Sequence, residues 1–166
     1  MITLPYLNDM RQAFVAHLAD RLSAQVCTET AELFEKRGIQ TPIRSASALL
    51  NLYRSGPATL AEMARTDGQS HQLLTTRIAP LEGLGLVRRT IDASDARRRP
   101  YELTKRGLAE ARHVELTCAD IAAAMQDLFD ETGVDLTMAL DAAMEALRLT
   151  PLESRFSQAK RRTANG

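Results

Sequence analysis

The sequence predicts a mainly α-helical fold with one small β-hairpin. Alanine and leucine supply most of the apolar side chains, Trp is absent and aromatic residues make up only 4% of the 166 residues, a composition that favours helices. Apolar residues recur at helical spacing in several segments that Gly or Pro separates. Residues 87–103 instead combine two strand-like runs with a polar turn, the pattern of a hairpin.

Residues 1–40 are expected to contain one long helix, from about Asp9 to Lys36, which Gly38 ends. Its apolar residues recur at nearly helical spacing, and a helix of this length cannot bury such a face alone. We therefore interpret residues 1–40 as an N-terminal dimerisation helix, with Phe14 and Leu18 at the interface.

Two short helices are predicted next. Thr41-Pro42 would supply a cap and a first-turn proline for a helix that ends before Gly56-Pro57. Thr59 and Glu62 have the spacing of a capping box, which predicts a second short helix that ends near Asp67.

A further helix is predicted from His71 to about Leu84, with Ser70 as its cap and Gly85 at its end. Pro80 lies inside it and should bend its last turn. Polar side chains occupy its first two turns, at Gln72, Thr75, Thr76 and Arg77.

The hairpin that follows carries three consecutive arginines at its tip. Its first strand is expected over Val87 to Ile91, and Pro100 is tolerable only at the start or edge of the second strand. Arginines at the tip of a tight ribbon suit DNA phosphates or a narrow minor groove, whereas a solvated loop is the alternative interpretation. The order helix, turn, helix, hairpin over residues 41–106 is that of a winged helix-turn-helix.

Two helices are expected in residues 107–150, the first ending at Gly133 and the second capped by Asp135 and ending at Thr150-Pro151. We interpret them as C-terminal dimerisation helices of a two-fold dimer. Leu140, Met144 and Leu147 are the interface residues predicted there. Residues 151–166 are polar and basic, and we expect a flexible tail.

Charge is unevenly distributed although the net charge is zero. Residues 41–106 hold eleven Lys/Arg against six Asp/Glu, and residues 107–147 hold one against nine. A basic middle segment favours nucleic acid as the partner. There is no signal peptide or bilayer-spanning segment, and the two cysteines lie far apart in sequence, so we expect a soluble cytoplasmic protein with reduced thiols and no membrane partner.

Several spaced pieces of the sequence together resemble the MarR family of bacterial winged-helix regulators. The pieces are Leu81-Glu82-Gly83-Leu84-Gly85-Leu86-Val87-Arg88-Arg89, then Asp92 and Asp95-Ala96-Arg97, then Leu103-Thr104-Lys105-Arg106-Gly107. The resemblance covers roughly residues 10–150 and is strongest from Thr59 to Gly107. It implies a homodimeric regulator, more often a repressor, that binds a pseudo-palindromic double-stranded DNA operator.

Carried over to this chain, the resemblance assigns Thr59–Arg65 as the supporting helix and Ser70–Leu84 as the recognition helix. It makes Arg97 the wing-tip arginine for the minor groove, with Asp95 orienting it. The predicted DNA-contacting residues are Ser70, His71, Gln72, Thr75, Thr76, Arg77, Arg88, Arg89, Asp95, Arg97, Arg98 and Arg99. Thr76 stands where an arginine is frequent in the family, and Arg77 could contact a base edge, contact a phosphate or support the fold.

The resemblance also implies a small aromatic or phenolic effector, for which His17, Arg44 and His113 are the candidate residues. No ligand spacing for a metal, no cofactor motif and no catalytic motif occurs, so we expect neither metal nor cofactor nor enzymatic activity. Two alternatives stay open: a regulator that senses oxidants through Cys27 or Cys118, and a protein-binding adaptor that no longer binds DNA.

Overall fold

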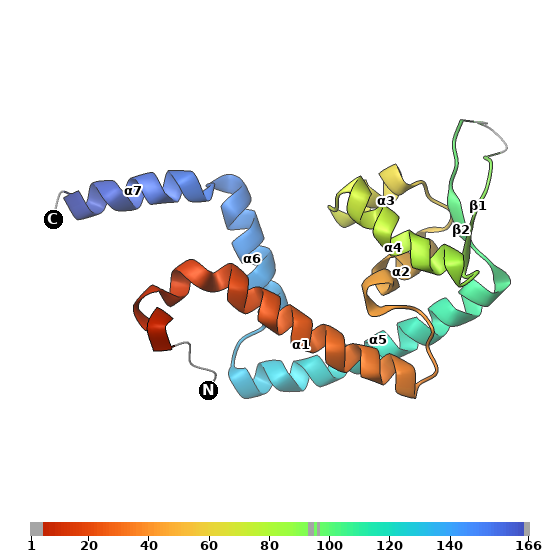
Figure 1. The fold of residues 1–166 in the computed structure, drawn as a ribbon, viewed down its shortest axis with the longest axis horizontal. Helices are drawn as coiled ribbons and strands as arrows, with labels where there is room; N and C mark the ends of the chain where they lie inside the picture. The colour runs from red at the N-terminus through yellow and green to blue at the C-terminus, as the bar shows by residue number, and fades with distance from the viewer. Residues whose placement is uncertain (1–4, 93–94, 96, 165–166) are drawn as a thin grey trace. The chain divides into compact units, whose positions relative to one another are not determined.

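The computed structural model describes residues 5–92, 95 and 97–164, and residues 1–4, 93–94, 96 and 165–166 lie outside the described residues. The chain divides into two compact units, Met1–Ala119 and Asp120–Gly166. Figure 1 shows helices throughout and one hairpin, which confirms the predicted fold class. The Arg-rich tip predicted for the hairpin includes residues 93–94 and 96, which are not described.

The first unit contains the predicted winged helix-turn-helix. Its elements are η1 (Pro5–Phe14), α1 (Val15–Lys36), η2 (Ile43–Ser45), α2 (Ala46–Ser55), α3 (Leu60–Asp67), α4 (His71–Gly83), β1 (Val87–Arg89), β2 (Tyr101–Leu103) and the first part of α5 (Lys105–Thr132). Three short helices followed by a hairpin is the order that the sequence predicted (Figure 1).

The hairpin strands pair in antiparallel register, with Arg89 opposite Tyr101. Tyr101 also pairs with Ala58 on its other side, through Tyr101 N to Ala58 O at 2.8 Å and Ala58 N to Tyr101 O at 3.1 Å. The second strand is therefore flanked on both sides, which the sequence did not indicate. Pro100 lies directly before β2, as predicted, while β1 ends at Arg89 and not at Ile91.

A single apolar core joins the helix-turn-helix to α5. Its largest fully buried side chains include Leu49 of α2, Met63 of α3, Leu74 of α4, Leu86 just before β1 and Val114 of α5. These residues come from five separate segments, so burial of their side chains fixes the first part of α5 against the helix-turn-helix.

Gly107 explains how α5 comes so close to the start of the hairpin. A Cβ atom at this position would lie 1.8 Å from the backbone oxygen of Leu86. Only a glycine fits such an approach of one backbone to another. The Leu-Thr-Lys-Arg-Gly motif thus ends in a residue that the packing requires.

The segment between α1 and α2 is held by a carboxylate of α5. Glu110 Oε1 accepts hydrogen bonds from the backbone N–H of Gln40 (2.6 Å) and of Thr41 (2.9 Å), and from the Thr41 hydroxyl (3.1 Å). The prediction that Thr41 caps the following helix is therefore wrong. Its hydroxyl is used by a residue 69 positions away, which no local pattern could indicate.

The N-terminal helix also differs from its prediction. An α-helix was expected from about Asp9, but the chain forms a 3-10 helix up to Phe14 and α1 begins only at Val15. Phe14 makes no side-chain cap bond at this junction. A regular apolar spacing does not distinguish the two helix types over so short a stretch.

The second unit, from Asp120, contains the rest of α5, α6 (Leu136–Leu149) and α7 (Leu152–Ala164). Gly133, with φ +68°, ends α5 as predicted. Asp135 Oδ1 caps α6 as predicted, and accepts from the backbone N–H of Thr137 (2.9 Å) and Met138 (3.0 Å). The hydrogen bond from the Thr137 side chain is the main cause that lowers the pKa of Asp135.

The expectation of a flexible tail after Pro151 is wrong for residues 152–164, which form α7. Arg155 donates to two carbonyl oxygens at the end of α6, Thr150 O (2.9 Å) and Ala146 O (2.7 Å). Glu153 in the first turn, with Arg161 and Arg162 in the last, suits the helix dipole. With few apolar residues, this helix gave no periodic signal. No helix in the described part of the chain is long and apolar enough to cross a membrane.

Candidate nucleic-acid interface

Helix α4, the predicted recognition helix, is fixed by a cap at its start and by three buried residues on one side. Ser70 Oγ accepts a hydrogen bond from Leu73 N at 3.2 Å, as the sequence predicted. Leu74, Ile78 and Leu81 recur at the spacing of one helix face and are at most 1% exposed. That face is therefore committed to the core, and the opposite face of α4 is available to a ligand.

The predicted contact residues at the start of α4 do lie on the exposed side. Ser70, His71, Gln72, Thr75 and Thr76 are all exposed. Because they fall in the first turn and a half, they lie before Pro80, which is itself exposed within the last turn of the helix. The part of α4 that would enter a groove is thus free of the proline.

Arg77 is held against the neighbouring helix. Its Nη1 donates to the Ser47 hydroxyl of α2 at 3.2 Å, and the side chain is half-buried. The Nε atom is buried and has no hydrogen-bond partner among the described residues. Of the three roles left open by the sequence, this geometry favours support of the fold.

Helix α3, predicted to be the supporting helix, begins with the predicted capping box. Glu62 Oε2 accepts from Thr59 N at 2.7 Å, and Thr59 Oγ1 accepts from Glu62 N at 3.3 Å. These bonds satisfy two backbone donors that a helix start otherwise leaves without partners.

Glu62 has a second partner in the hairpin, which we call the wing. Arg98 donates to the Glu62 carboxylate from Nε and from Nη2, and Nη2 lies 2.8 Å from Oε2 and 2.9 Å from Oε1. The third nitrogen, Arg98 Nη1, donates to Asp92 Oδ2. The bond from Thr59 N and then that from Arg98 lower the pKa of Glu62 below its ordinary value. Arg98, Glu62 and Asp92, which we call the wing clamp, therefore fasten the wing to the first turn of α3.

The wing clamp changes the expected role of Arg98. The sequence placed Arg98 among the DNA-contacting residues, but its guanidinium is occupied by two carboxylates and only 34% of the side chain is exposed. A guanidinium bound in this way positions the wing and is not available as a phosphate ligand without breaking these bonds.

Asp95 also acts differently from the expectation. Its Oδ1 accepts from the backbone N–H of Arg97 at 2.9 Å, and Arg98 N donates to Asp95 O at 2.9 Å. Asp95 thus fixes the turn of the main chain and does not hold the Arg97 guanidinium. That guanidinium is exposed and has no partner among the described residues.

The other wing arginines lie on exposed positions. Arg88 forms an ion pair with Glu102 across the hairpin at 2.6 Å, and the Arg89 guanidinium lies 5.8 Å from the centroid of the Tyr101 ring. Arg99 is exposed. The ion pair with Glu102 holds Arg88 across the hairpin, whereas the Arg97 guanidinium is exposed at the turn and has no partner among the described residues.

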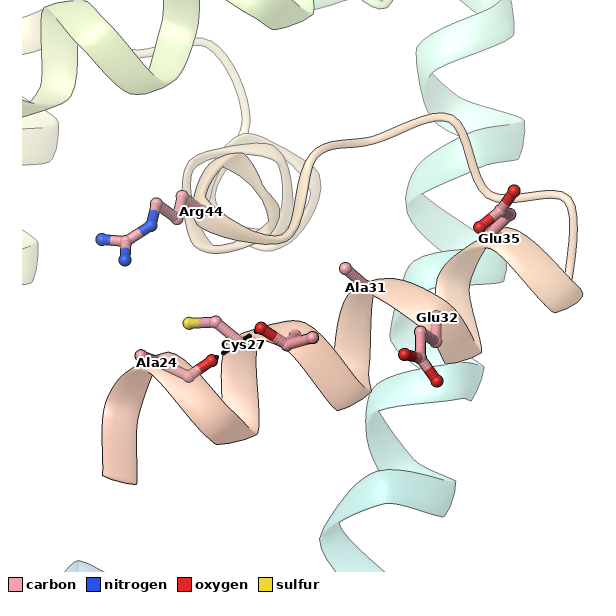
Figure 2. Close-up of a pocket in the computed structure, with 7 residues that line it drawn as sticks. Ala24, Cys27, Ala31, Glu32, Glu35 and Arg44 are labelled. Carbon is pink, nitrogen blue, oxygen red and sulfur yellow. Dashed lines mark hydrogen bonds between the residues drawn. The ribbon is translucent and has the colours of Figure 1, made fainter. Parts of the chain in front are cut away.

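A cavity of about 480 Å³ lies between α1 and η2 (Figure 2). Of the three effector candidates, Arg44 lines it, whereas His17 on α1 and His113 on α5 are exposed and do not. Figure 2 shows Arg44 facing the turn of α1 that carries Cys27, with Glu35 towards the other end. The remaining lining residues are Ala24, Thr28, Ala31 and Glu32.

Both cysteines are reduced and half-buried. Burial raises the pKa of the Cys118 thiol, which favours the unreactive neutral form. Within the described residues, no group of three or more His, Cys, Asp or Glu side chains is arranged to hold a metal ion.

The predicted dimer residues are incompletely covered within one chain. Phe14 is 39% exposed, Leu140 52%, Met144 60% and Leu147 48%, while Leu18 is half-buried. Helix α6 has no buried residue. An exposed apolar set of this size on a single helix is typical of a surface that another protein chain covers.

No local sequence pattern indicates the roles of Glu62 and Asp92 in the wing clamp or that of Ala58 beside β2. Glu62 and Arg98 lie 36 positions apart, and no motif spacing connects them. A carboxylate already assigned to a capping box carried no signal of a second partner.

Taken together, a helix with an exposed polar face, a capped supporting helix and an arginine-bearing hairpin define a winged helix-turn-helix protein. Residues 37–98 match the model of the MarR family. Over these residues the chain resembles the MarR family of winged helix-turn-helix proteins.

Solved structures with low sequence identity share the fold. The MarR family transcription regulator SP03579 is 19% identical with a TM-score of 0.57, over 90% of this chain and 95% of that one. The heme sensor protein PefR from Streptococcus agalactiae, in complex with heme, is 12% identical with a TM-score of 0.55, over 89% and 97%. NMB1585, a MarR family regulator from Neisseria meningitidis, is 19% identical with a TM-score of 0.53, over 87% and 97%. No curated protein sequence matches the chain.

Proposed function

We propose that the protein is a homodimeric, effector-responsive repressor that binds a pseudo-palindromic operator. The observation that carries this proposal is the exposed polar face of α4 on the same compact unit as the exposed Arg97 of the wing. In a two-fold dimer, two such helices would enter successive major grooves about 34–36 Å apart. Arg97 would reach the adjacent minor groove or backbone.

Dimerisation is supported by the exposed apolar side chains outside the helix-turn-helix. Leu140, Met144 and Leu147 of α6 are each about half exposed or more, and Phe14, 39% exposed, lies directly before α1. Placing such side chains against a second copy removes apolar area from water at roughly 25 cal/mol per Å². We therefore assign α1, α5 and α6 to the dimer interface.

Within this function, Arg88, Arg89, Arg97 and Arg99 supply charge to phosphates, and Arg98 is a positioning residue. The Arg97 guanidinium is exposed and has no partner among the described residues, which suits an anionic ligand such as DNA. A protein-binding adaptor would not require such an arginine in the wing, so the adaptor alternative is disfavoured. The raised pKa of Cys118 disfavours that thiol as an oxidant sensor.

A small aromatic acid or phenol is the proposed effector, bound in the cavity beside Arg44. Arg44 would meet a carboxylate or phenolate, and the neighbouring carboxylates of Glu32 and Glu35 would disfavour a second negative charge. The proposal predicts that substituted benzoates release the wild-type protein from DNA and that Arg44→Ala abolishes this response. Arg11→Ala, another exposed arginine, is the control.

The first test of the function is fluorescence anisotropy on DNA from upstream of the protein's own gene, against scrambled DNA, at several salt concentrations. We expect selective, salt-sensitive binding that Arg97→Ala weakens, while Arg161→Ala on the exposed surface of α7 leaves it unchanged. Equal weak binding to both DNAs, indifferent to Arg97, would contradict the proposal once selection from random DNA also yields no site.

A further inference from the structure

The outward face of the recognition helix carries no charge. With about 100° per residue, Gln72, Thr76 and Ala79 form a stripe opposite the buried stripe of Leu74, Ile78 and Leu81. All three outward residues are exposed, and Thr75 lies exposed at the edge of the same stripe. We call Gln72, Thr75, Thr76 and Ala79 the reading stripe.

The two threonines of the reading stripe have already used their hydroxyl protons. Thr75 Oγ1 donates to His71 O at 2.9 Å, and Thr76 Oγ1 donates to Leu73 O at 2.7 Å. A hydroxyl has one proton to donate, so only lone pairs and the methyl group are left for a ligand. Together with the Ala79 methyl, these side chains present a largely apolar surface to whatever enters the groove.

Gln72 is the one residue of the reading stripe with a hydrogen-bonding fork. Its amide is exposed in the first turn of α4 and has no partner among the described residues. A Gln amide presents a donor and an acceptor side by side, which match N7 and the N6 amino group of adenine.

Guanine would require an arginine or lysine in this position, and α4 offers none. Its single basic residue other than His71 is Arg77, which leaves the helix about 100° beyond Thr76. Arg77 is held by Ser47 at 3.2 Å and is half-buried. The commonest contact to guanine in protein–DNA complexes is therefore missing from the reading stripe.

Resting on the proposed function, we propose that the base pairs contacted by α4 in each half-site are A·T pairs. Gln72 binds an adenine edge, while the methyl groups of Thr76 and Ala79, with Thr75 at the edge, contact the C5 methyl groups of thymines. The arginines of the wing add affinity without selecting these bases. The operator class is thus set by an uncharged helix face and not by charge.

Selection of binding sites from random duplex DNA by the wild-type protein tests the proposal directly. The selection is repeated with Gln72→Ala, and some positions of the site should then lose their base preference. At those positions, the sites selected by the wild type should have A·T pairs. Gln72→Arg should convert one adenine per half-site to guanine, a change in preference of about fivefold or more. Both variants alter an exposed side chain, and circular dichroism checks that the helices are retained.

A second experiment, which measures affinity for DNA with deoxyuridine in place of thymine, distinguishes methyl contacts from hydroxyl contacts. Deoxyuridine replaces thymine at the selected positions, which removes only the C5 methyl group. Wild type and Thr76→Val, which keeps the methyl group, should lose about fourfold in affinity for each contacted thymine. Thr76→Ser, which keeps only the hydroxyl, should lose this discrimination at the thymine that Thr76 contacts and keep it at thymines contacted by Ala79 or Thr75.

Two results would overturn the inference. Selected sites with G·C pairs at the Gln72-dependent positions, lost in Arg77→Ala, would refute the A·T assignment and leave the regulator function standing. If wild type enriches no site at all and binds DNA without dependence on Arg97, the proposed function and this inference fail together.

Discussion

The recognition helix and the wing are built by different means. Helix α4 is fixed by local features, the Ser70 cap and the buried stripe that includes Leu74. The wing is held by distant partners, the clamp of Arg98 on Glu62 and the pairing of Tyr101 with Ala58. The helix carries the uncharged outward face, and the wing carries the arginines. In the proposed function, selectivity and electrostatic affinity therefore belong to separate elements, and each can be altered alone.

The largest effect is expected in the buried stripe of α4. Leu74→Ala removes a fully buried side chain and should lower the free energy of unfolding by about 2–5 kcal/mol. Leu73→Ala, next to it but 41% exposed, is the matched control and should change it by about 0.5 kcal/mol or less. Denaturant unfolding measures both. Equal losses would mean that α4 is not anchored by this stripe.

The division between selectivity and charge is sharpened by Arg97→Ala. Loss of one phosphate or minor-groove contact should weaken binding to all sequences alike and reduce the slope of log affinity against log salt by about 1. Gln72→Ala should instead reduce the ratio of operator to scrambled binding and leave the salt slope unchanged. Anisotropy titrations at several salt concentrations give both quantities. If Arg97→Ala changes the preference among sequences as strongly as Gln72→Ala does, the wing also contributes to selectivity and the proposed division is wrong.

A smaller effect is expected from the wing clamp. Glu62→Gln keeps a side chain that can cap α3 but removes the charge that binds Arg98. Because the pair is partly exposed, the coupling between Glu62→Gln and Arg98→Met should be about 1 kcal/mol or less in a double-mutant cycle of unfolding. Glu62→Gln and Arg98→Met should each lower DNA affinity, because either change loosens the attachment of the wing to α3. Additive effects on stability would show that the clamp does not couple the two residues.

The smallest expected effect is the pH dependence of this coupling. The pKa of Glu62 is lowered from its ordinary value of 4.5 by the bonds from Thr59 and Arg98. A lowered pKa in the folded state means that the stabilisation is complete above about pH 4.5 and is lost as the pH falls through the folded value. The stability difference between wild type and Glu62→Gln should therefore shrink only in acid. A difference that shrinks already near pH 7 would assign it to another group.

The features that could be predicted from the sequence depend on neighbours a few positions apart. Ser70, the Thr59–Glu62 capping box, Asp135 and Gly133 were all predicted as helix starts or ends and lie there in the structure. Such signals are reliable because both partners lie within one turn of the same helix, where spacing fixes geometry.

Features that join remote residues became visible only in the folded chain. Arg98 was predicted to contact DNA, but its guanidinium binds Glu62. Asp95 was predicted to orient the Arg97 guanidinium, but it accepts a hydrogen bond from the Arg97 backbone. Thr41 was predicted to cap a helix, but its hydroxyl donates to Glu110. Each of these polar groups can bind more than one kind of partner. Which partner is met depends on how α5, the wing and α3 come together in the apolar core, and that packing has no signature in local spacing.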